Sequence, residues 1–427
     1  MIDIDAVLSK GQKLADEVEI FVAGYDDLSV EQREMAVSSV FEHSGQNIYI
    51  RVVKNGKMGV SATSDPTKLD ACLRSAVSSA NLSDVIANWN GFARKGEIPA
   101  GKDPVDENLE ITPETAVEYL QRMNAGAEKY KEARIVTGGV TLTKGSSVLA
   151  NTNGVYLERK FTDISLGMDA ICEGSTGYDN DSSPFAERIH PEAIGEHTAY
   201  FATASRNGKT IESGKYDVVF SEDVVDSLLL ELFTEAVNGK NVMTGQSIYA
   251  GKLNETVINP KISIRDDPQN PAGDAWRRFD SEGTPAKALD IVKNGVLQTF
   301  LYDAKTAAQT GSKNTGHAHR AANGTTIIGP HCLTIDAPNG DVLEKPCMYI
   351  KEVIGAHTAN PLTGEFSVEV ANAFLAEGGS FKEPVRKAMI AGNVFDILKG
   401  DILISKGAKA MQGALVPMMR ISDLQVI

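Results

Sequence analysis

The chain has 427 residues, of which 42% are hydrophobic and 23% charged, so its length and composition suit a globular protein of two or three domains. A formal net charge of −15 without basic runs argues against direct nucleic-acid binding. No apolar run approaches the roughly 18 residues of a membrane span. Four scattered cysteines and an acidic start without a signal-peptide pattern predict a cytoplasmic protein.

Residues 1–88 are predicted to form an N-terminal α/β region. Val7 to Ala15 carry a short helical stripe, and residues 17–23 alternate as a strand. Asn55-Gly56 separates two further alternating runs and predicts a tight hairpin, because both residues tolerate positive φ. Asp65-Pro66 then opens an amphipathic helix.

A linker and a middle region follow. Residues 89–110 lose periodicity and gain glycine and proline, which predicts a linker. The middle α+β region, residues 111–212, opens with Thr112-Pro113, an N-cap followed by proline at the first helical position. Two strands around Asn153-Gly154 and a terminal helix complete this region.

Residues 213–427 are predicted to form a β-rich C-terminal domain. Its first strand precedes a helix that Ser221 caps and that runs to about Val237. Short β runs separated by turns follow, and Asn-Gly dipeptides between apolar runs favour hairpins. The predicted fold class is α+β, multi-domain and antiparallel β-rich, with helices packed on the sheets and a hairpin-rich C-terminal domain.

Four sequence blocks in the last region occur in a fixed order. They are Ser263-Ile264-Arg265-Asp266-Asp267-Pro268, Phe279 to Pro285, Ile291 to Gln298, and Thr315-Gly316-His317-Ala318. Together they resemble the TldD/PmbA (TldD/TldE) family, which is linked to zinc-dependent peptidases and to the phrase "modulator of DNA gyrase". The resemblance covers nearly the whole chain.

The resemblance implies a division of labour between two kinds of subunit. A TldD-like subunit supplies zinc and catalysis, and a PmbA/TldE-like subunit without zinc pairs with it around a chamber that admits flexible peptides. Microcin precursors and unfolded antitoxins are the implied substrate types. In catalytic members, a HExxxH motif on the helix that opens the third region and a later cysteine hold the zinc.

The zinc ligands of the family are missing from this chain. With Gln246 to Leu253 as anchor, the motif positions fall on Leu230, Glu231 and Glu235, so both histidines are absent. The corresponding C-terminal segment, residues 408–417, contains no cysteine. We therefore expect no catalytic residue, no metal and no other cofactor here, with zinc only on a TldD-like partner.

The helix itself gives a compatible interpretation. Glu231 and Glu235 lie four residues apart, on one flank of the helix. They are expected to form a solvated helix face, a carboxylate pair that lines a cleft, or the oxygen ligands of a hard cation. On an ideal helical wheel, Leu230 points away from the apolar stripe. It is expected either as an isolated exposed leucine or facing a partner or an apolar cleft.

A candidate substrate cleft involves polar residues further along the chain. His317 and His319 would share one side of a strand, beside Arg320. Asp280 and Glu282 precede a turn at Gly283, and holding that turn is favoured over catalysis. Structural roles remain the alternative for the histidines as well.

The leading hypothesis is a metal-free, non-catalytic PmbA/TldE-like subunit that pairs with a TldD-like chain, or with itself, and helps to bind peptides. One alternative is an independently active peptidase with a site rebuilt from Glu231, Glu235, His317 and His319. The other is a peptide-binding scaffold that forms a homodimer.

Overall fold

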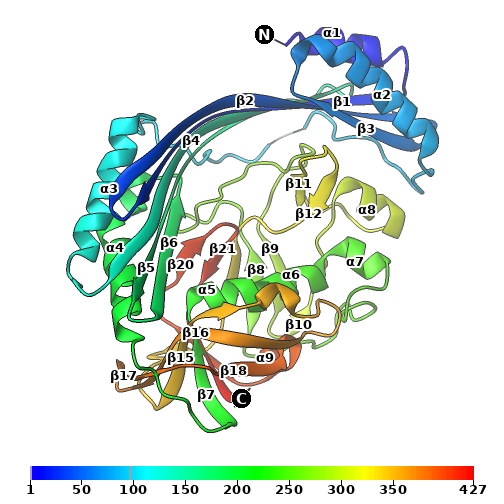
Figure 1. Ribbon diagram of the computed structural model, residues 1–427. Coiled ribbons are helices and arrows are strands. Elements are labelled where there is room, and N and C mark those ends of the chain that lie inside the picture. Colours follow the sequence, from blue (N-terminus) through cyan, green and yellow to red (C-terminus); the bar gives the residue numbers. More distant parts are fainter. Residues whose placement is uncertain (1, 97) are drawn as a thin grey trace.

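A long curved sheet arches over a C-terminal domain in the computed structural model, which describes residues 2–96 and 98–427 (Figure 1). The arrangement confirms the predicted multi-domain α+β fold, rich in antiparallel strands. Within the described chain, no helix combines the length and the apolar character needed to cross a membrane.

The curved sheet has six antiparallel strands in the order β3-β2-β1-β4-β5-β6. Their bounds are β1 (Glu17–Arg33), β2 (Ala36–Lys54), β3 (Lys57–Thr63), β4 (Arg134–Asn151), β5 (Tyr156–Cys172) and β6 (Ser175–Ser183). Because β1 pairs with β2 on one side and β4 on the other, one continuous sheet joins the N-terminal and middle regions.

Two pairs of helices cover the outer face of this sheet, one pair at each end (Figure 1). They are α1 (Ile4–Gly11) with α2 (Leu69–Leu82), which follows the short 3₁₀ turn Pro66–Lys68, and α3 (Pro113–Ala127) with α4 (Pro191–Ala204). Side chains alternate between the two faces of a strand. Val18 and Ile20 of β1 are therefore buried under one helix pair and Leu28 and Val30 under the other. Odd-numbered residues such as Glu19 face the C-terminal domain.

Local signals in the sequence are confirmed where the turn or cap chemistry is strong. Asn55 and Gly56 both have positive φ, +52° and +73°, in the β2–β3 hairpin. The Thr112 side chain accepts from the Thr115 backbone N–H at 3.1 Å and caps α3. Between α2 and α3, the described residues contain no helix or strand, and the predicted linker lies in this stretch. The domain boundaries themselves remain predictions.

The C-terminal domain contains two larger sheets and the small β11–β12 ribbon. One sheet has the order β10-β9-β8-β13-β21-β20; the other has the order β14-β19-β22-β18-β16-β15-β7, with β17 paired to β16. A β22–β7 pairing closes the path β7-β15-β16-β18-β22 on itself, which removes two strand edges. The strands are β7 (Gly214–Phe220), β8 (Ser263–Asp266), β9 (Leu289–Lys293), β10 (Val296–Leu297), β11 (Ala318–Arg320), β12 (Thr326–Ile328), β13 (Leu333–Asp336), β14 (Asn339–Gly340), β15 (Cys347–Ile354), β16 (Glu365–Glu377), β17 (Ser380–Val385), β18 (Met389–Asn393), β19 (Ile402–Ser405), β20 (Lys409–Met411), β21 (Ala414–Val416) and β22 (Met419–Val426).

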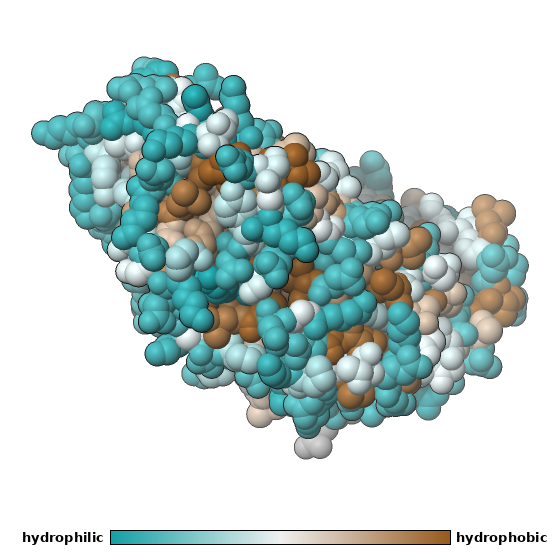
Figure 2. Space-filling view, turned by 90° about the horizontal axis from the view of Figure 1, so that it is seen from below, coloured by the Kyte–Doolittle hydropathy of each residue, from teal (hydrophilic) through white to brown (hydrophobic). Residues whose placement is uncertain are grey.

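The helix predicted after Ser221 lies in the core of this domain and packs against both sheets (Figure 1). It consists of α5 (Glu222–Val224), a π-helical stretch (Val225–Leu230) and α6 (Glu231–Val237). The remaining helices are α7 (Gly239–Met243), α8 (Ala304–Thr310) and α9 (Val394–Lys399), with 3₁₀ turns at Ala186–Arg188 and Ala356–Thr358. Seen from below in Figure 2, apolar residues form separate groups among hydrophilic ones.

Candidate functional site

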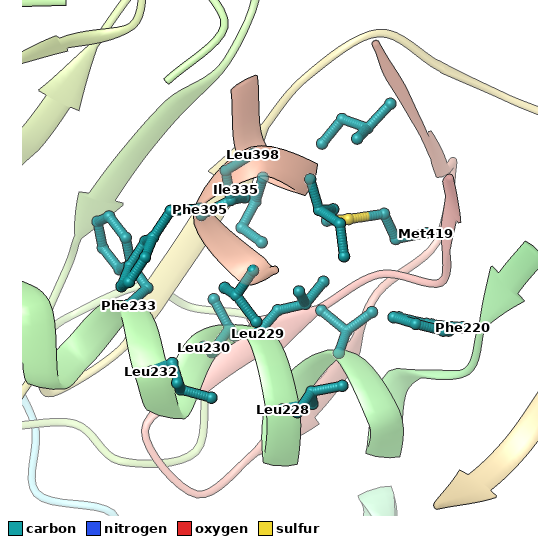
Figure 3. Packing of buried hydrophobic residues seen from close by; sticks show 14 of the residues in the cluster. Phe220, Leu228, Leu229, Leu230, Leu232, Phe233, Ile335, Phe395, Leu398 and Met419 are labelled. Carbon is teal, nitrogen blue, oxygen red and sulfur yellow. The ribbon is translucent and has the colours of Figure 1, made fainter. Parts of the chain in front are cut away.

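The zinc-motif helix, on which the resemblance places the family's zinc-motif positions, is an element of the hydrophobic core. Ser221 begins it as predicted, with its hydroxyl accepting from the Val224 backbone N–H at 3.3 Å. Apolar side chains from this helix contact Phe395 and Leu398 of α9 and Met419 of β22 within one cluster (Figure 3). The helix is therefore held by packing.

Leu230 corrects one prediction from the sequence. It was expected on the face opposite the apolar stripe, but it is only 4% exposed and belongs to the core cluster (Figure 3). The reason is the π-helical stretch, which ends with the Glu231 backbone N–H donating to the Asp226 carbonyl five residues earlier. A π turn takes more residues than an α turn and rotates the following side chains around the axis. The first histidine position of the motif is thus sealed by packing.

Glu231 and Glu235 differ from each other in environment. Glu231 is exposed. Glu235 is partly buried, and its carboxylate accepts a hydrogen bond from the side-chain amide of Asn241 at 2.5 Å. Of the interpretations left open, the solvated flank describes Glu231. Among the described residues, neither glutamate belongs to a group of three donors that could hold one ion.

The segment that carries the late cysteine in the family forms a hairpin of β20 and β21 here. Residues 408–417 contain no cysteine, and Cys347 lies buried in β15, part of the other sheet. Leucine cannot ligate zinc, and the Glu235 carboxylate is already bound by an amide. The residues that the resemblance assigns to the zinc positions do not fit the ion.

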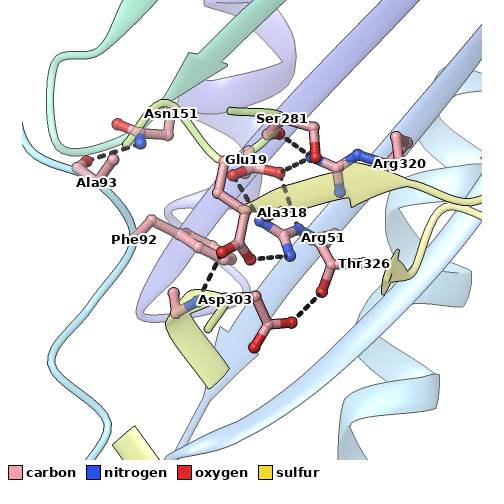
Figure 4. A network of polar contacts seen from close by, with 12 residues as sticks. Glu19, Arg51, Phe92, Ala93, Asn151, Ser281, Asp303, Ala318, Arg320 and Thr326 are labelled. Atoms are coloured by element: carbon pink, nitrogen blue, oxygen red, sulfur yellow. Dashed lines mark hydrogen bonds and ion pairs between the residues drawn. The ribbon is translucent and has the colours of Figure 1, made fainter. Parts of the chain in front are cut away.

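A buried ionic network connects the inner face of the curved sheet with the C-terminal domain (Figure 4). Glu19 and Arg51 lie directly opposite each other on β1 and β2. Arg51 donates two hydrogen bonds to Glu19, each 2.8 Å long, and one of 2.6 Å to Glu282. Arg320 donates at 2.8 Å to Oε1 of Glu19, the oxygen that also accepts from Arg51 Nε. Two arginines and two glutamates thus balance in charge.

Burial sets the electrostatics of this network, since all four side chains are at most 5% exposed. Burial alone would raise the pKa of Glu19, but attraction to Arg51 and Arg320 outweighs it and holds that pKa below its usual range. Burial raises the pKa of Glu282, which Arg51 opposes only in part. The Arg51 guanidinium also stacks over the Phe92 ring at 5.1 Å.

The Asp280 side chain stabilises the turn at Gly283, next to Glu282 of the ionic network. One carboxylate oxygen accepts from the backbone N–H groups of Glu282 and Thr284 at 2.9 and 2.8 Å, and the other accepts from Ala318 at 3.1 Å. Burial and the nearby Glu282 raise the pKa of Asp280 to about 7. Gly283 adopts φ +80° at the tip, where a side chain would be strained.

Three histidine rings lie next to one another beside this turn, and the rings of His317 and His331 are stacked. His317 is fully buried, and its Nε2 lies 3.1 Å from the Asp266 carboxylate. His331 is also buried, and the centroid of its ring lies 5.1 Å from that of His317 and 5.1 Å from that of His319. Burial lowers the pKa of His319 to about 3, with Arg277 contributing. His319 therefore carries no charge at neutral pH.

The structure places the candidate cleft residues close together and encloses most of them, whereas His319 is only partly buried. His317, Asp280 and Glu282 are each at most 2% exposed, and the Arg320 side chain is 5% exposed. His317 and His319 were predicted to share one side of a strand; His319 lies in β11, whereas His317 comes just before it. Contact of this group with a peptide remains a prediction.

The site rebuilt from Glu231, Glu235, His317 and His319 is not assembled in this fold. In residues 2–96 and 98–427, the donors that converge are Asp266, His317 and His331, and only His317 belongs to the predicted set. Asp266 lies in a sequence block already marked by the resemblance, but nothing local connected it with His331. The Glu19–Arg51 pair was also missed, although each charge interrupts a Val/Ile-rich strand.

Two cavities border the polar interior. One, of about 430 Å³, reaches Arg51 and is also lined by Lys240, Asp303 and Lys305. The other, of about 400 Å³, is lined by Arg159 and Arg277 among others. Burial lowers the pKa of Arg159 to about 9, and repulsion from the nearby Arg277 guanidinium adds to this effect.

Comparison with known proteins identifies the family. The chain matches the PmbA/TldA metallopeptidase domain 1 over residues 18–80, the central domain over 106–206 and the C-terminal domain over 213–427. It is 30% identical to an uncharacterised protein of Methanocaldococcus jannaschii over 401 residues, 93% of each chain.

Solved structures agree with this assignment. A Thermotoga maritima protein named for modulation of a DNA gyrase superposes with a TM-score of 0.89 at 26% identity, covering 99% of both chains. TldE from Thermococcus kodakarensis has the same fold, with a TM-score of 0.88 at 23% identity and 99% coverage of both chains. This chain belongs to the TldD/PmbA family of metallopeptidase-related proteins.

Proposed function

We propose that this chain is a PmbA/TldE-type subunit that has no catalytic metal at the family's zinc positions and acts with a TldD-like, zinc-bearing chain in proteolysis. The observation that carries the proposal is the state of the zinc-motif helix. Leu230 fills the first histidine position inside the core, and Glu235 fills the second. No cysteine stands in residues 408–417 to complete a site.

In this proposal the subunit stabilises its partner and helps to enclose a chamber for flexible peptides, of the microcin-precursor or antitoxin type. The 23% identical TldE structure supports the fold required for that role. The cytoplasm is the proposed compartment, because all four cysteines are buried and unpaired.

The test compares three preparations: this chain alone, a TldD-like chain with an intact HExxxH motif alone, and the two expressed together. We expect hydrolysis of an unstructured reporter peptide from the co-expressed pair, and none from this chain alone even with added zinc. Glu231→Gln in this chain should leave the activity of the pair unchanged. The glutamate of the partner's HExxxH, changed in the same way, should abolish it.

Each alternative has its own signature in the same experiment. Zinc-dependent turnover by this chain alone would support an independently active peptidase and contradict the proposal. A stable homodimer that binds the peptide, and never forms a complex with a TldD-like chain, would support the scaffold.

A further inference from the structure

Three potential metal ligands converge in the C-terminal domain, away from the zinc-motif helix. Asp266 ends β8, His317 lies just before β11, and His331 lies just before β13. Each is fully buried, and one donor atom from each lies within 4.8 Å of the others. Whether the three groups can bind a cation depends on which nitrogen of each histidine carries a proton.

His331 carries a buried lone pair on one ring nitrogen. Its Nε2 lies 2.7 Å from the carbonyl oxygen of Gly316. A carbonyl can only accept, so Nε2 carries the proton and Nδ1 carries the lone pair in the neutral ring. Nδ1 is buried and, among the described residues, has no hydrogen-bond partner. A buried polar atom without a partner is rare and calls for a ligand.

His317 is oriented in a comparable way by Thr315. The Thr315 hydroxyl accepts from the Tyr302 backbone N–H at 2.7 Å and donates to the Tyr302 carbonyl at 3.2 Å. When the hydroxyl donates to the Tyr302 carbonyl, it can only accept at its 2.9 Å contact with His317 Nδ1, and this arrangement places the imidazole proton on Nδ1. Nε2 of the neutral ring is therefore also a lone pair, and it faces Asp266.

Asp266 adds a carboxylate to the two histidines. Its Oδ1 accepts from the backbone N–H groups of His331 and Cys332 at 2.8 and 2.7 Å. These bonds favour the ionised carboxylate. The other oxygen, Oδ2, lies 3.1 Å from His317 Nε2. Two lone pairs at that separation need a cation or a proton between them.

We propose that Asp266, His317 and His331 bind a divalent transition metal, with zinc as the best match. Zn–N and Zn–O bonds of about 2.0–2.2 Å place tetrahedral ligand atoms roughly 3.3 Å apart, and two ligating imidazole rings with centroids roughly 5 Å apart. The observed values are 3.1 Å between Asp266 and His317 and 5.1 Å between the His317 and His331 rings. Imidazole and carboxylate donors suit zinc among the first-row metals.

The surroundings of the ligands are those of a prepared site. Each neutral histidine donates its single N–H to an oxygen, the Thr315 hydroxyl for His317 and the Gly316 carbonyl for His331, which fixes the ring and its tautomer. The three ligands come from three segments, so a bound ion clamps β8, β11 and β13 together. Because the site is closed to solvent, its role is structural. This goes beyond the proposed function, which concerns only the zinc-motif helix.

The experiment uses the full chain, stripped with a chelator and reloaded with zinc or with Co²⁺. Elemental analysis after gel filtration should give one zinc ion per chain, and Co²⁺ should produce the intense visible absorption of a tetrahedral site. Asp266→Asn and His331→Gln should each lose stoichiometric binding. Thr315→Val should weaken zinc affinity by about 10–100-fold, because Thr315 acts only by positioning a ligand.

Matched controls use histidines outside the ligand set. His357→Gln, on an exposed turn, and His319→Gln, beside the ligands, should keep full stoichiometry. Wild-type protein that takes up no stoichiometric zinc and shows no Co²⁺ absorption would overturn the proposal, and would assign a proton to His317 Nε2 instead. Unchanged zinc affinity in Thr315→Val would overturn it too, and this variant does not remove a buried charge. Since no step measures hydrolysis, the proposed function stands or falls separately.

Discussion

The zinc-motif helix and the buried polar interior differ in what they bury: the helix buries apolar side chains, and the interior buries charged and imidazole groups. Along the helix, Leu230 stands at the position that the resemblance assigns to the first histidine, and it is buried in the core. In the interior, charged and imidazole groups remain buried, although burying them costs free energy unless each finds a partner. Arg51, Glu19, Glu282 and Arg320 satisfy that condition with one another.

The difference between the two regions shows which residues can be replaced singly and which cannot. On a helix, a hydrophobic side chain can stand at a ligand position because its burial in the core is enough to stabilise the fold. A buried ionic or imidazole cluster cannot be lost one member at a time, since each deletion leaves another group unpaired. The sizes of mutational effects in the two regions test this comparison.

The largest effect is expected in the ionic network, for Arg51→Met. Methionine keeps much of the volume but leaves Glu19 and Glu282 buried without their shared cation. We expect a loss of about 3–5 kcal/mol in the free energy of unfolding, measured by urea denaturation. Lys10→Met removes an exposed pair with Asp70 and serves as the control, with little expected change. Equal effects in the two variants would show that burial of the network is not decisive.

A somewhat smaller effect is expected for Leu230→Ala in the zinc-motif helix. If the π-helical stretch turns Leu230 into the core, the cavity should cost about 2–4 kcal/mol of unfolding free energy. Leu253→Ala, at a leucine that is 46% exposed, should change it by no more than about 0.5 kcal/mol. A Leu230 variant as mild as this control would mean that the helix is regular and the leucine outside the core.

The same residues show how far the sequence could predict this molecule. Asn55-Gly56 and Thr112-Pro113 predict their hairpin and helix start because those conformations depend on neighbouring residues. Leu230 was misplaced because a π turn is selected by tertiary packing, which an ideal wheel does not contain. Asp266 and His331 are 65 residues apart, and pairing of β8 with β13 brings them together.

Glu19 and Arg51 fall between these cases. The hairpin of β1 and β2 places them directly opposite each other, and each is a charge within a run of Val and Ile. The alternation thus contained a signal for a buried cross-strand pair. Its connection to Glu282, on a segment 231 residues away from Arg51, required the folded chain.

The smallest effect is expected from Asp226, within the π-helical stretch. Burial, with repulsion from Asp223 and Glu231, raises its pKa from 3.8 to about 6. Between these two values the folded chain binds more protons than the unfolded chain, so stability falls as the pH rises through this window. Asp226→Asn removes the penalty and should stabilise the protein at pH 7 by roughly 1–2 kcal/mol, allowing for partial solvent screening. The gain should disappear near pH 4, whereas Asp84→Asn, at an exposed carboxylate, should show no such pH-dependent gain. Urea denaturation of both variants across this pH range tests the prediction. A gain in stability that does not depend on pH would come from packing, and would contradict the interpretation that the charge on Asp226 destabilises the folded chain.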